Sequence, residues 1–353
     1  MLFCSIMADE RRVLVTGGAG YIGSHTAKAL AASGCLPVVF DDLSNGHAEA
    51  VRWGPLVVGD VRDTVAVAAC MREHQIDSVV HFAGLIEVSH SMAEPQLFWD
   101  VNLNGVASVL RAMHVCALRR LVFSSTAAVY GQPDVRSLQP LSESLRTQPI
   151  NPYGHSKSAA ERLIAAHARA NGIQAVALRY FNACGADPDG EIGEAHHPES
   201  HLIPLAIEAA LGVGPPLVVF GQDFPTLDGC CIRDYVHVTD LARAHVLALE
   251  VDLGGNGFTV LNLGLGRGRS VLEVIAAVSE TVGRPTPYLF GSRRSGDPAC
   301  LVADPARAMI QLGWAPTFTD LNEIVATAVS WHRAPAFGAS SPPNFRRGSD
   351  RHG

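Results

Sequence analysis

The sequence lacks the patterns that identify several classes of protein. No apolar run is long enough to cross a bilayer, and the first ten residues are too few and too poor in basic side chains for a secretory signal. No basic run occurs in the body of the chain, and its 27 Lys and Arg are outnumbered by 34 Asp and Glu. We therefore expect a cytoplasmic protein that binds neither membranes nor nucleic acid.

Metal centres and disulfide frameworks are not expected either. The eight cysteines are scattered and form no CxxC pair, so single buried thiols are the better interpretation. Fifteen histidines are present, and His196, His197 and His201 lie close together in the sequence. They fall in a loop rich in Pro and Gly, without a matching set of ligands elsewhere, so we predict no metal site.

The sequence does contain a regular alternation of short buried strands and helices. Its 48% hydrophobic content is ample for a large core. Up to Asn182 the strands end in small or polar residues, which is typical of a Rossmann-type, doubly wound parallel sheet. We therefore predict an α/β protein with a cofactor-binding domain at residues 11–182 and a smaller mixed α/β substrate domain at 183–333. Residues 234–265 are expected to return to the large sheet, and residues 334–353 to form a disordered tail.

A glycine-rich turn joins the first predicted strand, residues 12–16, to the first predicted helix, residues 24–33. Gly18, Gly20 and Gly23 match the pattern GxGxxG. Such a turn needs glycine because side chains would keep the backbone away from a pyrophosphate, to which the helix N-terminus offers free N–H groups. A glycine string alone could be only a tight turn, but its place between a strand and a helix predicts a dinucleotide site.

An acidic residue in the expected place indicates which dinucleotide is bound. The predicted strand at residues 36–40 is followed by Asp41, which lies 18 residues past Gly23. An acidic side chain here can bind both hydroxyls of a ribose and would repel a 2′-phosphate, so we predict NAD rather than NADP. The alternative is that Asp41 only caps the end of the strand.

Two groups of side chains are candidates for acid–base chemistry. Ser124, Ser125 and Thr126 follow a predicted strand, where they either face the ligand crevice of a parallel sheet or only form turn hydrogen bonds. Tyr153 and Lys157 are four residues apart and therefore share one face of a helix. A positive charge near a phenol lowers its pKa from the usual ~10, which would make Tyr153 a usable acid and base. A lone pair of this kind is usually part of an amphipathic helix, but the preceding glycine loop favours catalysis.

Two arginines stand out in the second half of the chain. Arg233 and Arg294 could each clamp a phosphate through two hydrogen bonds. The alternative for each is a surface salt bridge. This half has no nucleotide fingerprint of its own, so we expect it to shape a substrate pocket.

Taken together, these stretches resemble one known family, the extended short-chain dehydrogenase/reductases. The resemblance covers residues 12–332, and within the family it points to the UDP-sugar 4-epimerases. Motifs from both halves match, namely residues 13–26, 81–84, 123–126, 151–157, 178–182 and 228–238. The loop at residues 192–201 is most similar to bacterial epimerases that supply UDP-galactose for exopolysaccharide. The family also implies a homodimer formed through a four-helix bundle, with residues 102–115 and 151–171 as candidate helices.

The resemblance implies roles for particular residues. Tyr153 is the acid and base, Lys157 lowers its pKa and binds the nicotinamide ribose, and Thr126 hydrogen-bonds the sugar 4-hydroxyl. Besides Tyr153 and Lys157, the residues implied in binding NAD are Gly17, Gly20, Tyr21, Ile22, Gly23, Asp41, Asn45, Asp60, Val61, Phe82, Ala83, Gly84, Asn102, Ser124 and Tyr180. The residues implied in binding the UDP-sugar are Thr126, Asn182, His201, Leu202, Phe220, Arg233, Arg294, Asp297 and Leu301.

Three positions depart from the pattern of the best-studied epimerases. Ile86 stands two residues after Gly84, where many carry a Lys, so one cationic contact to the cofactor is missing. His201 occupies a position where many carry Asn. Leu301 lies at the position that gates the sugar pocket, and its intermediate size favours hexoses that are not N-acetylated.

The implied activity is the interconversion of UDP-glucose and UDP-galactose. Transient NAD-dependent oxidation at C4 is followed by rotation of the 4-keto sugar and reduction from its other face. The main alternative is the same reaction on UDP-N-acetylglucosamine or a UDP-pentose. A 4,6-dehydratase would need an acidic pair where Ala127 and Ala128 follow Thr126. A dehydrogenase that releases NADH and a non-catalytic NAD sensor are further alternatives, the latter disfavoured because Tyr153 and Lys157 are both present.

Overall fold

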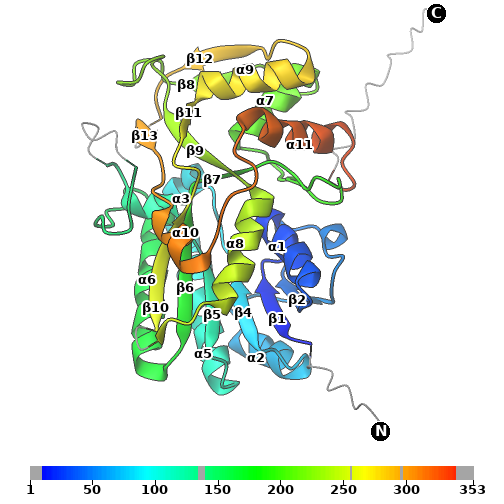
Figure 1. Ribbon diagram of the computed structural model, residues 1–353, viewed down its shortest axis with the longest axis vertical. Helices are drawn as coiled ribbons and strands as arrows, with labels where there is room; N and C mark the ends of the chain where they lie inside the picture. Colours follow the sequence, from blue (N-terminus) through cyan, green and yellow to red (C-terminus); the bar gives the residue numbers. More distant parts are fainter. Residues whose placement is uncertain (1–9, 134–139, 255–256, 295–296, 339–353) are drawn as a thin grey trace, which may run out of the picture.

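The largest element of the protein is a seven-stranded sheet (Figure 1). The computed structural model describes residues 10–133, 140–254, 257–294 and 297–338. The sheet order is β10-β6-β5-β4-β1-β2-β3, and every neighbouring pair is parallel. The strands are β1 (Arg12–Thr16), β2 (Leu36–Asp41), β3 (Leu56–Val58), β4 (Ser78–His81), β5 (Arg120–Thr126), β6 (Gln174–Tyr180) and β10 (Phe258–Leu263). The strand order reverses between β1 and β4, which confirms the predicted Rossmann-type fold and places a ligand crevice at this point.

Helices cover both faces of this sheet, because successive side chains along a strand point to opposite faces. On one face Leu14 and Phe123 pack against α2, α5 and α6, and on the other Val13 and Val15 pack against α1, α8 and α10. These helices are α1 (Tyr21–Ala32), α2 (Thr64–Glu73), α5 (Gly105–Val115), α6 (Pro152–Asn171), α8 (Val238–Glu250) and α10 (Ala306–Leu312). Among the described residues, no helix has both the length and the apolar character needed to cross a membrane.

A smaller part of the protein lies beyond the carboxyl ends of the large sheet, at the top of Figure 1. It has its own apolar core, to which three helices and strand β8 contribute, and β8 pairs in parallel with the more exposed strand β12. A second small sheet is mixed, since β9 pairs in parallel with β7 and β13 but antiparallel with β11. The elements are α7 (Leu202–Leu211), α9 (Val271–Val282), α11 (Leu321–Arg333), β7 (Asn182–Cys184), β8 (Leu217–Phe220), β9 (Ile232–His237), β11 (Gly268–Ser270), β12 (Tyr288–Gly291) and β13 (Cys300–Leu301).

The chain passes between the two parts more than once. After β9 in the smaller part it forms α8 and β10, and β10 becomes the edge strand of the large sheet beside β6. The remaining elements are short. They are α3 (Val88–Ala93), α4 (Pro95–Phe98), the π-helical turn Trp99–Asn104 and the 3₁₀ turns Ala48–Ala50 and Ala127–Tyr130.

The packed chain continues past the predicted end of the substrate domain at residue 333. The ring of Phe337 lies 5.0 Å from that of Trp331 and 5.3 Å from that of His47, measured between centroids. Phe337 therefore joins the end of α11 to the loop after β2. Residues 339–353, the rest of the predicted disordered tail, lie outside the described residues.

Candidate active site

A cavity of about 340 Å³ lies at the carboxyl ends of the central strands. Its wall includes most residues that the sequence assigned to the cofactor and several assigned to the substrate. These are Gly17, Gly20, Tyr21, Ile22, Gly23, Asp41, Asn45, Asp60, Val61, Phe82, Ala83, Gly84, Ser124, Thr126, Tyr153, Tyr180, Asn182, His201 and Leu202. The fold thus brings residues far apart in the sequence to one crevice, where ligands of open α/β sheets bind.

The glycine turn is too tightly packed for side chains at two of its positions. A Cβ at Gly23 would lie 2.2 Å from the Gly17 carbonyl oxygen, and one at Gly17 would lie 2.5 Å from the Ala83 amide nitrogen. Gly20 differs, since the only neighbour of its Cβ would be the same carbonyl oxygen at 3.4 Å, and the residue borders the cavity. The turn therefore exposes bare backbone at the start of α1, as binding of a pyrophosphate requires.

Asp41 ends β2, where its carboxylate accepts hydrogen bonds from two backbone amides. Its Oδ2 accepts a hydrogen bond from the Ala19 amide and its Oδ1 one from the Leu43 amide, each 2.9 Å long. Burial raises the pKa of its carboxyl group, and these two hydrogen bonds oppose the rise. The side chain also borders the cavity, so a carboxylate fixed by backbone donors faces the space that a ribose would occupy.

Tyr153 and Thr126 form the polar centre of the site. Asn151 caps α6 by accepting a hydrogen bond of 2.8 Å from the Gly154 amide, which fixes the first turn that carries Tyr153. The Thr126 side chain at the end of β5 lies close enough to the phenol to lower its pKa. Its ring packs edge-on against Phe98, with 6.4 Å between the centroids. The hydroxyl groups of Tyr153 and Thr126 are therefore positioned to share a proton with a substrate hydroxyl.

Lys157 lies behind this pair and is only 2% exposed. Its Nζ donates a hydrogen bond of 3.1 Å to the Ser124 carbonyl oxygen and lies 5.0 Å from the centroid of the Phe123 ring. Lys157 does not border the cavity itself. The ammonium group of Lys157 is thus bound to the end of β5 beside Tyr153 and not to the Tyr153 hydroxyl group.

Burial affects the protonation of both members of this pair. It raises the pKa of Tyr153 to about 12, although the Thr126 side chain lowers it in part. Burial also lowers the pKa of Lys157 to about 8, against the opposing effect of Glu161. Desolvation thus acts on both groups and favours their neutral forms in the protein alone, while the lowering of the phenol pKa by Lys157 stays a prediction.

Two further residues assigned to the cofactor hold neighbouring parts of the wall. The hydroxyl of Tyr180, at the end of β6, is hydrogen-bonded to the Ser124 hydroxyl. Asn102 lies behind the wall, where its Oδ1 accepts from the Leu85 amide at 2.8 Å and its Nδ2 donates to Ser156 Oγ at 3.0 Å. Asn102 therefore fastens the loop after β4 to α6 rather than bordering the cavity.

The other residues assigned to the UDP-sugar gather on the smaller part of the protein, outside the cavity wall. Arg233 Nη2 is paired with Asp297 Oδ1 at 3.0 Å, and the Arg294 guanidinium lies 3.9 Å from the centroid of the Phe220 ring. Leu301 is the strand partner of Arg233. The ion pair of Arg233 is not a surface salt bridge, since its side chain is only 11% exposed. The structure thus joins these residues into one cluster on β8, β9 and β13 and the loop between β12 and β13.

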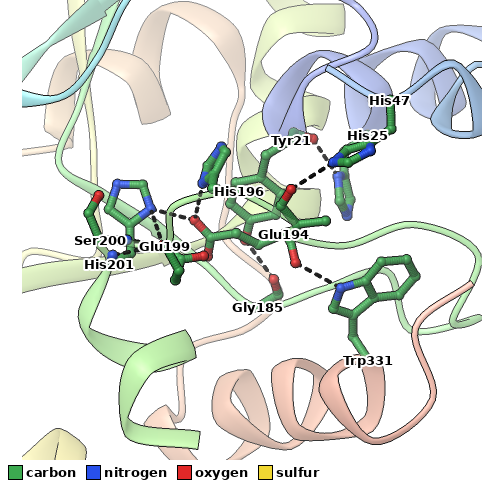
Figure 2. A network of polar contacts seen from close by, with 11 residues as sticks. Tyr21, His25, His47, Gly185, Glu194, His196, Glu199, Ser200, His201 and Trp331 are labelled. Carbon is green, nitrogen blue, oxygen red and sulfur yellow. Dashed lines mark hydrogen bonds and ion pairs between the residues drawn. The ribbon is translucent and has the colours of Figure 1, made fainter. Parts of the chain in front are cut away.

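Sequence reasoning missed a group of ionisable residues at the same wall, shown in Figure 2, in which Glu194, His196 and His201 line the cavity and Glu199 adjoins His201. Glu194 Oε1 accepts hydrogen bonds from the Nδ1 atoms of His196, at 3.1 Å, and of His201, and Glu199 Oε1 lies 3.7 Å from His201 Nδ1. Burial would raise the pKa of Glu194, but the two histidines hold it at about 2. The clustered histidines were the available signal, but the acidic residues between them were not considered.

Residues 13–264 match the NAD dependent epimerase/dehydratase family. The chain is 48% identical to a UDP-glucose 4-epimerase of Rhizobium leguminosarum bv. trifolii over 326 aligned residues. The alignment covers 92% of this chain and 98% of that relative.

Solved structures show the same similarity. A UDP-glucose 4-epimerase from Brucella ovis in complex with NAD is 47% identical, with a TM-score of 0.86 over 90% of this chain and 97% of that one. A UDP-glucose 4-epimerase from Bifidobacterium longum in complex with NAD+ and UDP is 36% identical, with a TM-score of 0.87 over 93% of this chain and 100% of that one.

Proposed function

This chain belongs to the NAD dependent epimerase/dehydratase family, and we propose that it interconverts UDP-glucose and UDP-galactose as an NAD-dependent 4-epimerase. The observation that carries the proposal is a pair of hydroxyl-bearing side chains, Tyr153 and Thr126, which lie near each other in the wall of the cavity. Such a pair can remove and return the proton of a secondary alcohol. The chain aligns with UDP-glucose 4-epimerases over nearly the whole length of those relatives.

The cavity has the features that NAD requires. The glycine turn at the start of α1 leaves no room for side chains at Gly17 and Gly23, and the Asp41 carboxylate borders the cavity beyond it. When bound, NAD+ supplies the hydride acceptor for oxidation at C4, and NADH supplies the donor for the reverse step. We assign the pyrophosphate to the glycine turn, the adenosine ribose to Asp41 and Asn45, and the adenine to Asp60 and Val61.

In the proposed reaction Tyr153 takes the proton of the 4-hydroxyl group and later returns it to the 4-keto oxygen. Thr126, at the end of β5, hydrogen-bonds the same oxygen and relays the proton. Lys157 holds the strand end through the Ser124 carbonyl oxygen, and we assign the nicotinamide ribose to it from the family resemblance. Because every proton moves between the protein and one oxygen of the sugar, the hydroxyl is regenerated without net consumption of acid or base.

The nucleotide would hold the substrate while the sugar turns. We propose that Arg233 and Arg294 bind the diphosphate, with Phe220, Asp297 and Asn182 completing the UDP site. These residues lie on the smaller part of the protein, whereas Tyr153 and Thr126 lie on the large sheet. Anchoring one end of the substrate and leaving the hexose loosely held lets either face of the 4-keto sugar be presented for reduction.

The proposal also covers the two domains, the assembly of the active form, the location of the reaction and the use of its product. Residues 11–182 carry the cofactor site, and residues 183–333 carry most of the substrate site. The active form is a homodimer in which α5 and α6 of each copy form a four-helix bundle. Since the cofactor and the sugar nucleotide are cytoplasmic metabolites, we place the reaction in the cytoplasm. The likeness of residues 192–201 to exopolysaccharide-type epimerases supports a role in supplying UDP-galactose for that polymer.

The test is conversion of UDP-galactose by the purified protein without added NAD. Formation of UDP-glucose is expected, and the Tyr153→Phe variant should lower kcat by roughly 10²-fold or more, because it removes the acid and base. Conversion that needs added NAD would indicate weak cofactor retention at Ile86. UDP-N-acetylglucosamine serves as the competing substrate. A Tyr153→Phe variant with normal turnover, or faster conversion of the acetylated sugar, would refute the proposed mechanism or the proposed substrate, respectively.

A further inference from the structure

The cluster around Glu194 is the strongest feature of the cavity that the reaction has not used. Glu194 lies in the loop before α7, and its side chain is only 5% exposed. Trp331 on α11 donates a hydrogen bond of 2.8 Å to its carbonyl oxygen, which fixes the backbone beneath the carboxylate (Figure 2). A buried carboxylate on a fixed backbone is a precise anchor for the side chains that donate to it.

His201 is the member of the cluster that faces a ligand. It precedes α7, borders the cavity and has a side chain that is 44% exposed. Its Nδ1 is hydrogen-bonded to Glu194, and Figure 2 shows the other ring nitrogen on the side away from that carboxylate. Nε2 is thus the atom left for a ligand in the cavity. When both ring nitrogens carry protons, the side chain is a cation that donates at both ends.

On the basis of the proposed function, we propose that Glu194 and Glu199 are positioning residues that keep His201 an imidazolium, whose Nε2–H binds an oxygen of the UDP-sugar diphosphate. The geometry supports this assignment because the Glu194 carboxylate, which lines the cavity, would otherwise repel an anionic substrate from that wall. A proton on His201 reverses the sign of the group nearest the cavity. It also lets the ring donate to a carboxylate and to a phosphate at the same time.

The charges around His201 act in the same direction. Burial by itself would lower the pKa of His201, but Glu194, then Glu199 and Glu87, raise it to about 9. The other ionisable groups facing the cluster among the described residues are His196 in the same loop, Tyr21 and His25 on α1, Cys184 on β7 and His332 on α11. Because the folded pKa of His201 is raised, its charged form is present at neutral pH and is lost as the pH rises through about 9.

The experiment measures KM and kcat for UDP-glucose between pH 7 and 10, together with the affinity for UDP by calorimetry. In the wild type, KM should be flat at neutral pH and rise above about pH 9. Glu194→Gln should raise KM at pH 8 by roughly tenfold with little change in kcat, since one charge-assisted hydrogen bond to the substrate is weakened. Glu199→Gln should act in the same direction but less, because Glu199 lies farther from Nδ1.

His201→Asn is the matched control, because it keeps a neutral donor and removes the titrating group. Its KM should not vary between pH 7 and 9, and adding Glu194→Gln to it should change nothing further. If Glu194→Gln raises KM equally in that background, or lowers kcat instead of affinity, the inference is overturned. Thermal unfolding checks that each variant folds. If Glu194→Gln does not fold, Glu199→Gln is used in its place for the same comparison.

Two further outcomes separate this inference from its rivals. The four ligand atoms of Glu194, His196, Glu199 and His201 lie within 4.8 Å of one another, a spacing that a metal ion could also use. One equivalent of metal in the purified protein, lost in Glu194→Gln, would overturn the inference, since a metal would then hold the ring in place of a proton. Absence of epimerase activity with the expected pH-dependent UDP binding would refute the proposed function and leave the role of Glu194 supported.

Discussion

Replacing Gly20 and Gly23 one at a time by Ala separates cofactor binding from folding. A Cβ at Gly23 meets the Gly17 carbonyl oxygen at 2.2 Å and the Gly18 Cα at 2.8 Å, so the turn itself must move. Gly20 has an extended backbone, with φ −81° and ψ 177°, and its Cβ would approach nothing closer than 3.4 Å. Gly23→Ala therefore strains the protein, whereas Gly20→Ala adds a methyl group only to the cavity.

The expected sizes follow from the structure. Forcing a methyl group against backbone in a packed turn costs about 3 kcal/mol. With an unfolding entropy of about 2.1 cal/mol/K per residue, a chain of 353 residues changes its Tm by about 1.3 °C per kcal/mol. Gly23→Ala should thus lower the Tm of the cofactor-free protein by about 4 °C. Gly20→Ala should leave that Tm within about 1 °C of the wild type.

The assay is thermal unfolding of the cofactor-free protein with and without NAD. Gly20→Ala should weaken NAD binding at least tenfold, because the methyl group occupies the path of the pyrophosphate. A tenfold weaker affinity reduces the stabilisation by saturating NAD by about 1.4 kcal/mol, or about 2 °C. If Gly20→Ala shows the full shift caused by NAD, the dinucleotide does not cross the glycine turn and the assignment of the cofactor site is refuted.

Three other substitutions test the buried charges and the cofactor wall. Lys157→Met should abolish turnover yet raise the Tm by up to about 4 °C at pH 7. The pKa of Lys157 is lowered to about 8, so burying its charged form destabilises the folded protein by on the order of 3 kcal/mol, and the substitution removes that cost. This gain should vanish above about pH 10.5, where the unfolded Lys is also neutral, and a gain that persists there would contradict the argument. Glu161→Gln removes the partner of Arg179, and both side chains are 6% exposed, so the Tm should fall by about 4–7 °C. An unchanged Tm would show that the pair is not isolated from water. Ile86→Lys should tighten NAD binding severalfold by adding a cation to the cavity wall, as measured by calorimetry and by the nucleotide retained on purification, and equal retention would rule out that contact.

The part of the site that the sequence predicted well is the part encoded by local pattern. The strand at residues 12–16, the glycine turn and the helix after it are contiguous, and each signals its conformation through its own residues. The spacing of Tyr153 and Lys157 likewise predicts one helix face, and both lie on α6. The parallel order of the sheet follows from the βα alternation, because crossover helices leave few other arrangements.

What the sequence did not reveal depends on contacts across long stretches of chain. The position of Glu194 beside the cavity depends on Trp331, more than a hundred residues later, which fixes the Glu194 backbone by a hydrogen bond. Lys157 is directed to the Ser124 carbonyl oxygen by the packing of α6 on β5, which spacing along one helix cannot show. The desolvation that changes the pKa of Tyr153 and Lys157 is likewise a property of the assembled fold.

The burial of Tyr153 and Lys157 also explains why the four-residue spacing of this pair is by itself weak evidence for catalysis. In the protein by itself the phenol keeps its proton to about pH 12 and the amine loses its proton near pH 8, so no phenolate is available at neutral pH. Forming one requires another positive charge close to Tyr153, and an oxidised nicotinamide ring in the cavity carries that charge. Tyr153 would then be a base while the cofactor is oxidised and an acid once it is reduced. In the reaction proposed above, the glycine turn would hold the group that lowers the phenol pKa, so the turn and the Tyr153–Lys157 pair would act together.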